Sequence, residues 1–221
     1  NRIKELKRTY TVVTKWTFFL TLPFLVLMLL FPDSILRILF GEEYVSGATA
    51  LSILSLGFFL SVSVGPVASI ILTLGRTKLN LLVSIISALL TVILSIVLVP
   101  IYGINGAAVA TGISQVSFTA ILFLFVYKFL KTQPFNLHYI KAVCAVLISS
   151  SLIYFIFKTT FTLIPLPFLL MSFVLFLFLY IFLLLIFKSL DEEDLMIIKA
   201  LEKKTGIRLG WIRRVMRKLI R

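Results

Sequence analysis

The stretch VPIYGINGAAVATG, residues 99–112, interrupts an uncharged run that extends over residues 79–127. A helix needs about 20 apolar residues to cross a hydrocarbon core of roughly 30 Å, so this run is long enough for two transmembrane helices. Proline cannot donate a backbone hydrogen bond and glycine weakens a helix, so residues 100–106 should form the turn between them. We therefore predict a transmembrane hairpin made of helices 79–99 and 106–127.

The composition of the whole chain extends this prediction to a membrane protein. Of its 221 residues, 60% are hydrophobic and 14% are charged, and the mean hydropathy is +1.12. The apolar runs do not alternate with polar residues as membrane β-strands do. The predicted fold is an all-α, polytopic membrane helical bundle over residues 16–188 with six transmembrane helices. The spans are expected at about residues 16–31, 48–74, 79–99, 106–127, 139–157 and 161–187.

The distribution of positive charge predicts the orientation of these spans. Of the 22 Lys and Arg residues, 20 fall on one side of the predicted membrane, and the other side holds Arg37 and Lys158. Basic residues accumulate in cytoplasmic loops, so both termini should be cytoplasmic, with a basic segment at 1–15 and an amphipathic basic tail at 189–221. The net charge of +13 is then a topology signal, and no nucleic-acid partner is expected.

The end of the tail has its own pattern. In residues 207–221, Trp211 and spaced aliphatic residues lie among Arg and Lys. This pattern is typical of a helix that lies on the anionic lipids of the inner leaflet. A solvated basic tail is the alternative.

The predicted spans carry hydroxyl and amide groups but no Asp, Glu, Lys, Arg or His in their interior. Ion coupling generally needs an ionisable group at depth, so the chain by itself offers none. Hydroxyl groups recur at helical spacing in the third and fourth spans, and helix packing is the alternative explanation for each of them. The amide of Gln115 must either pair with a neighbouring helix or face a water-filled cavity. The candidate cavity-lining residues are Ser84, Ser87, Thr91, Ser95, Thr111, Ser114 and Gln115.

Gly65 and Pro66 interrupt the second span near its middle. Proline removes one hydrogen bond within the helix, so this pair predicts a kink or an unwound point. Transporters often bend at such points, which makes Gly65 and Pro66 candidate hinge residues. A purely structural kink is the alternative.

The sequence does not predict an enzyme. It shows no nucleophile–base pairing, no Walker glycine loop and no paired carboxylates placed for catalysis. His138 has no Cys, Asp or Glu neighbour at metal-ligand spacing, so neither a metal nor a cofactor is expected.

Three ordered motifs resemble the C-terminal part of prokaryotic polysaccharide flippases, a family of the multidrug, oligosaccharidyl-lipid and polysaccharide exporter superfamily. They are FPDSILRILFGEEYVSGA at 31–48, GRTKLN at 75–80 and VPIYGINGAAVATGIS at 99–114. The residues of the last two motifs that match the family pattern are Gly75, Arg76, Lys78, Pro100, Tyr102, Gly103, Gly106, Ala107 and Ala108.

The resemblance implies a fold, a function and partners. The chain would be half of an inverted-V, two-bundle transporter, and the partner bundle would be an N-terminal helical bundle that this sequence lacks. Since the chain begins with Asn1 rather than Met, we expect it to start within a longer protein. The implied activity is export of lipid-linked oligosaccharide or polysaccharide precursors across the cytoplasmic membrane of a prokaryote by alternating access. A multidrug or small-molecule antiporter of the same superfamily and a non-transporting membrane scaffold are the alternatives.

Overall fold

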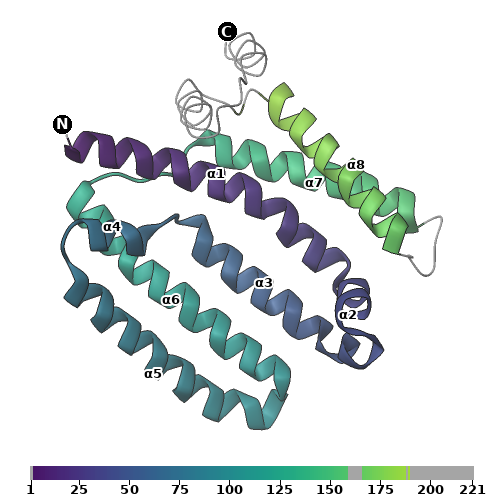
Figure 1. Cartoon of the computed structure of the whole chain (residues 1–221), viewed down its shortest axis with the longest axis horizontal. Coiled ribbons are helices and arrows are strands. Elements are labelled where there is room, and N and C mark those ends of the chain that lie inside the picture. The colour runs from purple at the N-terminus through teal and green to yellow at the C-terminus, as the bar shows by residue number, and fades with distance from the viewer. Residues whose placement is uncertain (1, 159–165, 188, 190–221) are drawn as a thin grey trace. The chain divides into compact units, whose positions relative to one another are not determined.

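The computed structural model describes residues 2–158, 166–187 and 189, and most of them are helical (Figure 1). No described residue lies in a β-strand, so the all-α prediction is confirmed for this part of the chain. The described helices form two compact units, α1–α6 and α7–α8. The predicted membrane-surface helix at 207–221 lies outside the described residues and stays a prediction.

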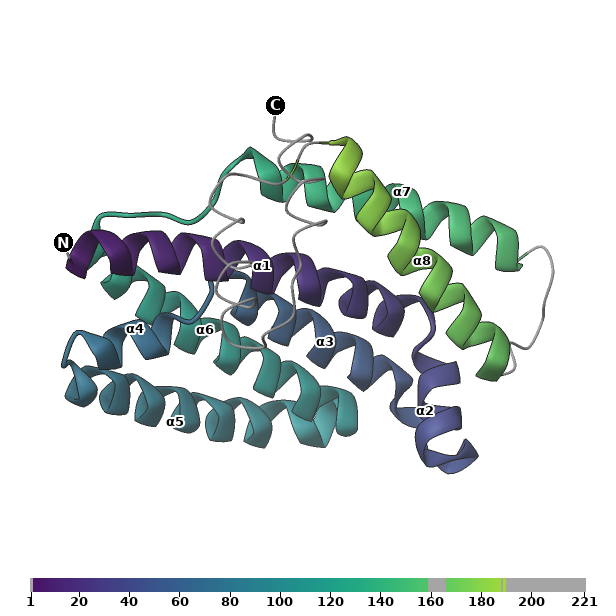
Figure 2. The ribbon, with the colours of Figure 1, turned by 45° about the horizontal axis from the view of Figure 1, so that its top comes forward.

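The first unit is a layer of long helices. Helix α3 packs against α1 on one side and against α6 on the other, and α6 packs against α5. Figure 2 shows the resulting order α1, α3, α6, α5. The elements of this unit are α1 (Arg2–Leu30), α2 (Pro32–Phe40), the 3-10 helix η1 (Glu42–Gly47), α3 (Ala48–Ser63), α4 (Val67–Thr73), α5 (Thr77–Tyr102) and α6 (Ile104–Leu130).

Four segments of this unit are long and apolar enough to cross a membrane. They are Ile3–Leu30, Glu42–Thr73, Thr77–Tyr102 and Ile104–Leu130, with lengths of 28, 32, 26 and 27 residues. Each overlaps one of the first four predicted spans. Because an α-helix rises about 1.5 Å per residue, 26 residues extend about 39 Å, which exceeds a hydrocarbon core of about 30 Å.

The second unit contains α7 (Leu137–Lys158) and α8 (Leu166–Ile186). They overlap the fifth and sixth predicted spans. Helix α7 has 22 residues and α8 has 21.

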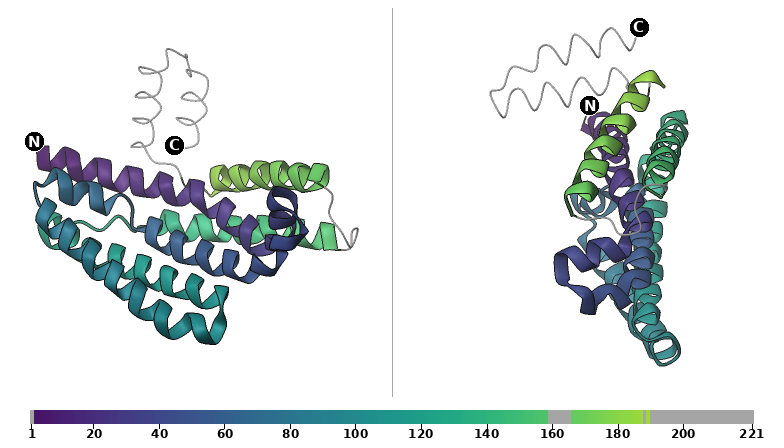
Figure 3. Two further views of the ribbon diagram at one scale, coloured as in Figure 1. Left: turned by 60° about the horizontal axis from the view of Figure 1, so that its bottom comes forward. Right: turned by 90° about the vertical axis from the view of Figure 1, so that its right-hand side faces the viewer.

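The hairpin turn is tighter than predicted. Helix α5 continues through Pro100 to Tyr102 and α6 begins at Ile104, so the expectation of a turn over residues 100–106 is wrong. Figure 3 (left) shows the two teal helices lying antiparallel and joined at this turn. Pro100 lies in the last turn of α5, where its missing N–H removes a single helical bond. The reversal is made at Gly103, whose φ of 56° is accessible to glycine and whose N–H donates to the Val99 carbonyl at 2.8 Å.

Helix α1 is longer than the predicted first span. It begins at Arg2, so the basic segment that we expected before residue 16 is helical and continuous with the span. The physical reason lies in the face that this segment buries. Tyr10, Val12 and Thr14 are buried among its charged residues, so tertiary packing extends the helix beyond the uncharged stretch.

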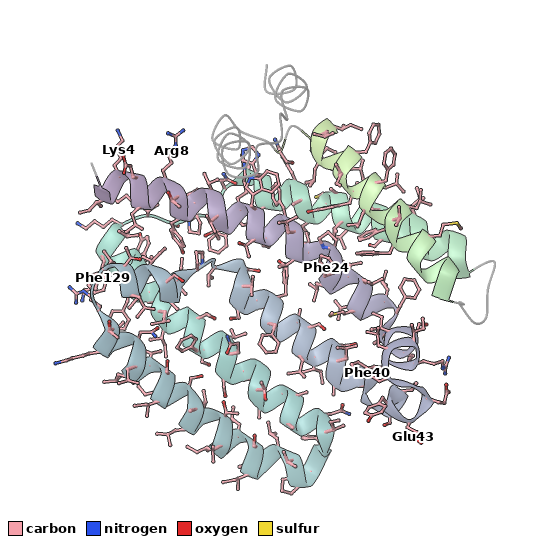
Figure 4. The ribbon with its side chains drawn as sticks, in the orientation of Figure 1. Lys4, Arg8, Phe24, Phe40, Glu43 and Phe129 are labelled. Atoms are coloured by element: carbon pink, nitrogen blue, oxygen red, sulfur yellow. The ribbon has the colours of Figure 1, made fainter. Side chains whose placement is uncertain are left out.

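The densest part of the first unit lies where α1, α4, α5 and α6 meet. Its buried side chains come from the first half of α1, from α4, from the start of α5 and from the end of α6. Lys4, Arg8 and Phe129 lie at this end of the unit in Figure 4, and Phe40 and Glu43 lie at the other end. The core residues are Tyr10, Val67, Ile70, Ile71, Val83, Leu122, Val126 and Leu130.

Candidate functional site

The GRTK motif closes helix α4 and turns the chain into α5. Gly75 has a φ of 73°, and its N–H donates to the Leu72 carbonyl at 2.9 Å. The Arg76 N–H donates to the Ile71 carbonyl at 3.1 Å. These two bonds define a Schellman motif, which requires a left-handed residue at the position of Gly75. The glycine of the motif is therefore explained by its backbone conformation.

The arginine of the same motif ties the turn to another helix. Its guanidinium lies over the ring of Phe129, 3.9 Å from the centroid, near the end of α6. A cation over an aromatic face is attracted by the ring quadrupole. Arg76 therefore links the α4–α5 turn to α6, while Lys78 is exposed.

Small residues bring α5 and α6 into close backbone contact after the turn. A Cβ atom built on Gly106 would contact the carbonyl group of Leu98 and lie 3.0 Å from the Val99 nitrogen. Ala108 is also buried, whereas Pro100 and Tyr102 are exposed. The motif residues from Gly106 onward thus permit close helix packing, as small residues do between membrane helices.

The hydroxyl groups of the hairpin bond to backbone carbonyls. Ser87 donates to the carbonyl of Ser114 at 3.0 Å, a bond that joins α5 to α6. Ser84, Thr91 and Ser114 each donate to the carbonyl four residues earlier in their own helix. Ser95 is half-buried. The structure therefore brings Ser87 and Ser114 together, in the arrangement that helix packing uses.

Gln115 meets a polar partner on a neighbouring helix. Its amide nitrogen donates to the hydroxyl oxygen of Ser61 in α3 at 3.2 Å, and Ser61 is only 2% exposed. Two turns of α3 and α6 are thereby joined by a side-chain hydrogen bond. Whether Gln115 also contacts a cavity in a complete transporter stays a prediction.

The chain unwinds at Val64–Pro66, between α3 and α4. Gly65 has a φ of 78°, and a Cβ atom at this position would collide with the side chain of Thr14 in α1. The break frees helical carbonyls, and the Tyr10 hydroxyl donates to that of Val64 at 2.8 Å. Tyr10 is 1% exposed. The α3–α4 break is thus fitted to α1 by shape and by hydrogen bonding.

Sequence reasoning missed Tyr10 and Thr14. Both lie in a segment whose Lys and Arg residues suggested a basic flank outside the membrane. The signal that could have found them is their spacing: residues i and i+4 share a helix face, and neither is charged.

A groove opens between α3 and α6 at the end of the unit that carries η1. Its volume is about 480 Å³. Thr111 lines it, together with the motif residues Ala107 and Ala108. Ser84, Ser87, Thr91, Ser95, Ser114 and Gln115 do not line it. A second groove of about 410 Å³ lies between α1 and α3, and its lining includes Phe24, Met28 and Phe58.

Of the two glutamates of η1 beside the first groove, one forms an ion pair with a described residue and the other does not. Arg37 of α2 donates to both carboxylate oxygens of Glu42, at 2.6 and 2.9 Å. These hydrogen bonds, and then the charge of Glu42, raise the pKa of Arg37. Glu43 also lines the groove and has no ion pair with any described residue. Within the described parts of the chain, no three His, Cys, Asp or Glu side chains are placed to hold a metal ion.

Comparisons of the sequence with known proteins show which family part of the chain is similar to. Residues 1–97 match the model of the MatE family. An uncharacterized membrane protein of Methanocaldococcus jannaschii is 33% identical over 123 residues, which are 55% of this chain and 24% of that protein. No solved structure gives a significant match.

Two further relatives carry informative names. A putative O-antigen transporter of Shigella flexneri is 30% identical over 125 residues, covering 56% of this chain and 30% of that protein. The capsular polysaccharide biosynthesis protein CapF of Staphylococcus aureus is 33% identical over 104 residues, covering 47% of this chain and 26% of that protein. The matched part of the chain therefore spans less than a third of each relative.

The four long apolar segments and the similarity to the MatE family indicate that the chain is part of a multi-pass membrane protein. Over residues 1–97 the chain is similar to the MatE family of the multidrug, oligosaccharidyl-lipid and polysaccharide exporter superfamily, and two of its relatives are named for O-antigen transport and for capsular polysaccharide biosynthesis. The resemblance carried by the three sequence motifs is thereby confirmed.

Proposed function

We propose that this chain is the C-terminal part of a membrane flippase that exports lipid-linked oligosaccharide or polysaccharide precursors. The observation that carries this proposal is the similarity to relatives named for O-antigen transport and capsular polysaccharide biosynthesis. The motifs at 75–80 and 99–114 form ordered turns, and the second of them brings α5 and α6 into close contact, which supports a shared scaffold.

The proposed architecture has six transmembrane helices in this chain. The four long apolar segments supply the first four, and α7 and α8 supply the fifth and sixth. They would form one bundle of an inverted-V transporter, with a second bundle contributed by residues N-terminal to Asn1. The short coverage of each relative is consistent with such a missing partner bundle.

Alternating access requires a part that can bend, and we assign this role to Gly65 and Pro66. The chain is already unwound there, so bending breaks fewer helical hydrogen bonds than in a continuous helix. Tyr10 stabilises one geometry of the break through its bond to the Val64 carbonyl.

The proposed location is the cytoplasmic membrane of a prokaryote, with both termini in the cytoplasm. Cys144 is the single cysteine of the chain, so it can be replaced by serine to give a cysteine-free background. New cysteines at Ser46 and Thr132 then report opposite sides. In intact cells, an impermeant maleimide should label the first and spare the second until the membrane is opened. Labelling of both or the reverse pattern would contradict this topology.

The transport proposal is tested with the full-length protein in sealed vesicles. A fluorescent lipid-linked oligosaccharide is placed in both leaflets, and its access to an impermeant quencher is followed over time. A flippase should expose nearly all of the fluorophore, whereas protein-free vesicles should expose about half. A scaffold protein would leave the exposed half unchanged.

A small-molecule antiporter would be recognised in the same vesicles. It would move a cationic dye in response to an ion gradient and leave the lipid-linked oligosaccharide in place.

Two variants test whether Gln115 contacts the substrate or only packs against α3. Gln115→Ala and Ser61→Ala remove opposite partners of the same hydrogen bond. A substrate contact at Gln115 predicts a larger loss of flipping for the first variant than for the second at equal stability.

A further inference from the structure

The groove between α3 and α6 has a chemistry that changes along its length. Polar groups of Glu43, Tyr44 and Ser46 line its end at η1, and the rest of the lining from α3 and α6 is apolar except for the hydroxyl group of Thr111. Between Leu51 and Phe58 the α3 wall advances seven residues, which is about 10 Å of helix axis. The groove is therefore polar at one end and apolar over roughly 10 Å below it.

Small residues keep this groove open. Ala107 and Ala108 line it on the α6 side, where larger side chains would fill it. At its inner end α3 and α6 touch through glycine: a Cβ atom built on Gly57 would lie 2.7 Å from the Cα of Gly112. The two helices therefore meet at this point and diverge toward η1, which leaves space for a narrow apolar chain.

The mouth of the groove carries a negative charge that the described residues do not neutralise. Glu42 is held by Arg37, whereas Glu43 has no such partner. A carboxylate at the membrane interface attracts an amine and repels a phosphate that lacks a nearby cation. The hydroxyl groups of Tyr44 and Ser46 can accept or donate hydrogen bonds beside it.

We propose that this groove binds one hydrocarbon chain of a bilayer phospholipid whose amine-bearing headgroup lies at Glu43, as in phosphatidylethanolamine. The apolar walls take the hydrocarbon chain, and the mouth takes the ammonium group. The proposal does not rest on which substrate the transporter carries, and the experiment below distinguishes a bilayer phospholipid from a lipid-linked substrate in this groove. A volume of about 480 Å³ is within the usual range of small-molecule sites.

The test uses the full-length protein in nanodiscs that contain phosphatidylethanolamine and phosphatidylglycerol. A phosphatidylethanolamine with a diazirine on one acyl chain is activated by light, and mass spectrometry maps the labelled peptides. We expect labels in Leu51–Phe58 of α3 or Ile104–Thr111 of α6. A phosphatidylglycerol with the same diazirine should label these peptides less.

Two pairs of variants make the assignment specific. Ala107→Phe fills the groove and should reduce the label several-fold, whereas Ala120→Phe, the same change at an exposed site on α6, should not. Glu43→Gln should lower the preference for the amine headgroup by about 1.4- to 5-fold, the range of an exposed ion pair. Asp33→Asn, at an exposed acid of α2 outside the groove lining, should leave this preference unchanged.

Several outcomes would overturn the proposal. Equal labelling by the two phospholipids, or labelling that Ala107→Phe leaves unchanged, would contradict binding of phosphatidylethanolamine in the groove. Stronger labelling by a diazirine-bearing polyprenyl phosphate would make the groove a substrate slot instead. If Ala107→Phe does not fold, Thr111→Leu adds volume at the same groove with a smaller change. The melting temperature of each variant distinguishes loss of the site from loss of the fold.

Discussion

The two arms of the hairpin, α5 and α6, are both long and apolar, yet they bury very different side chains. Within the described structure, the residue that α5 buries fully is Val83. The buried residues of α6 are Gly106, Ala108, Ala110, Gly112, Ser114, Thr119, Leu122, Val126 and Leu130. In a bilayer, lipid tails are as apolar as leucine, so large aliphatic side chains gain little from leaving them. Small residues contribute more to helix packing, because they allow the backbones of two helices to approach closely.

The two halves of α6 also differ in the size of the side chains that they bury. Its first half meets α3 and α5 through Gly and Ala, and its second half joins the core with Leu and Val. The groove lies beside the first half, and the densest packing lies at the second. Close approach and open space thus occur on the same helix within a few turns.

The largest effect should come from the glycine contact between α3 and α6. In Gly57→Ala the new methyl would lie 2.7 Å from the Gly112 Cα, so the backbones must separate. We expect a loss of about 3 kcal/mol, the upper end of overpacking. Gly112→Ala is the matched control, since its Cβ would lie 3.7 Å from the Gly57 Cα, an ordinary contact. Melting temperatures of the detergent-solubilised protein measure both, and equal losses would refute this asymmetry.

The next effect should come from a buried leucine of α6 compared with an exposed leucine of α5. Leu122 is 0% exposed and Leu89 is 58% exposed. Leu122→Ala leaves a cavity and should cost about 1–2 kcal/mol, below the range in soluble cores because lipid replaces water as the reference. Leu89→Ala should be nearly neutral. If Leu89→Ala is as destabilising as its partner, then α5 is covered by another part of the complete protein.

A smaller effect is expected at the α3–α4 break. Tyr10→Phe keeps the ring and removes the hydroxyl that bonds the Val64 carbonyl, which should cost about 1 kcal/mol. Hydrogen exchange at the amides of residues 64, 65 and 67 should increase, because the Tyr10 hydroxyl no longer holds the Val64 carbonyl. Tyr44→Phe is the control, since that tyrosine is exposed. Unchanged exchange in Tyr10→Phe would show that shape alone holds the break.

The smallest effect concerns the hydroxyl groups of the hairpin. Ser87→Ala removes a bond from α5 to α6 and should cost about 0.6 kcal/mol, the average for such bonds in membranes. Thr91→Val should be close to neutral, because its hydroxyl returns to the Ser87 carbonyl of its own helix. These variants also distinguish packing from substrate contact: packing predicts lost stability with normal flipping, and substrate contact predicts the reverse.

Much of the fold could be predicted from the sequence. Hydropathy alone located the four long apolar segments, and the glycines at 75 and 103 mark turns that need positive φ. The turn at residues 100–106 was predicted too long, because proline was expected to end a helix that only lost one bond at its last turn. The first span was predicted to begin at residue 16 because basic residues precede it, but α1 begins at Arg2 and its basic residues lie in the same helix as the buried Tyr10.

The candidate site was harder to predict, because its contacts join residues far apart in the chain. Gln115 was singled out from the cost of an amide in hydrocarbon, but its partner Ser61 is 54 residues away. Thr111, a candidate cavity-lining residue, lies in the lining of a groove, and its role in a transport cavity stays a prediction, whereas Ser114 on the same helical face is buried.

The sequence by itself determined that the chain is a helical membrane protein, where its long apolar segments lie and which family it resembles. These properties depend on local composition and backbone conformation, which each segment carries independently. The tertiary structure alone decided that Gly57 meets Gly112, that Tyr10 closes the break at Val64 and that a groove opens beside Ala107. The reason is that lipid and protein interior are similarly apolar, so hydropathy cannot tell which face of a helix packs against another.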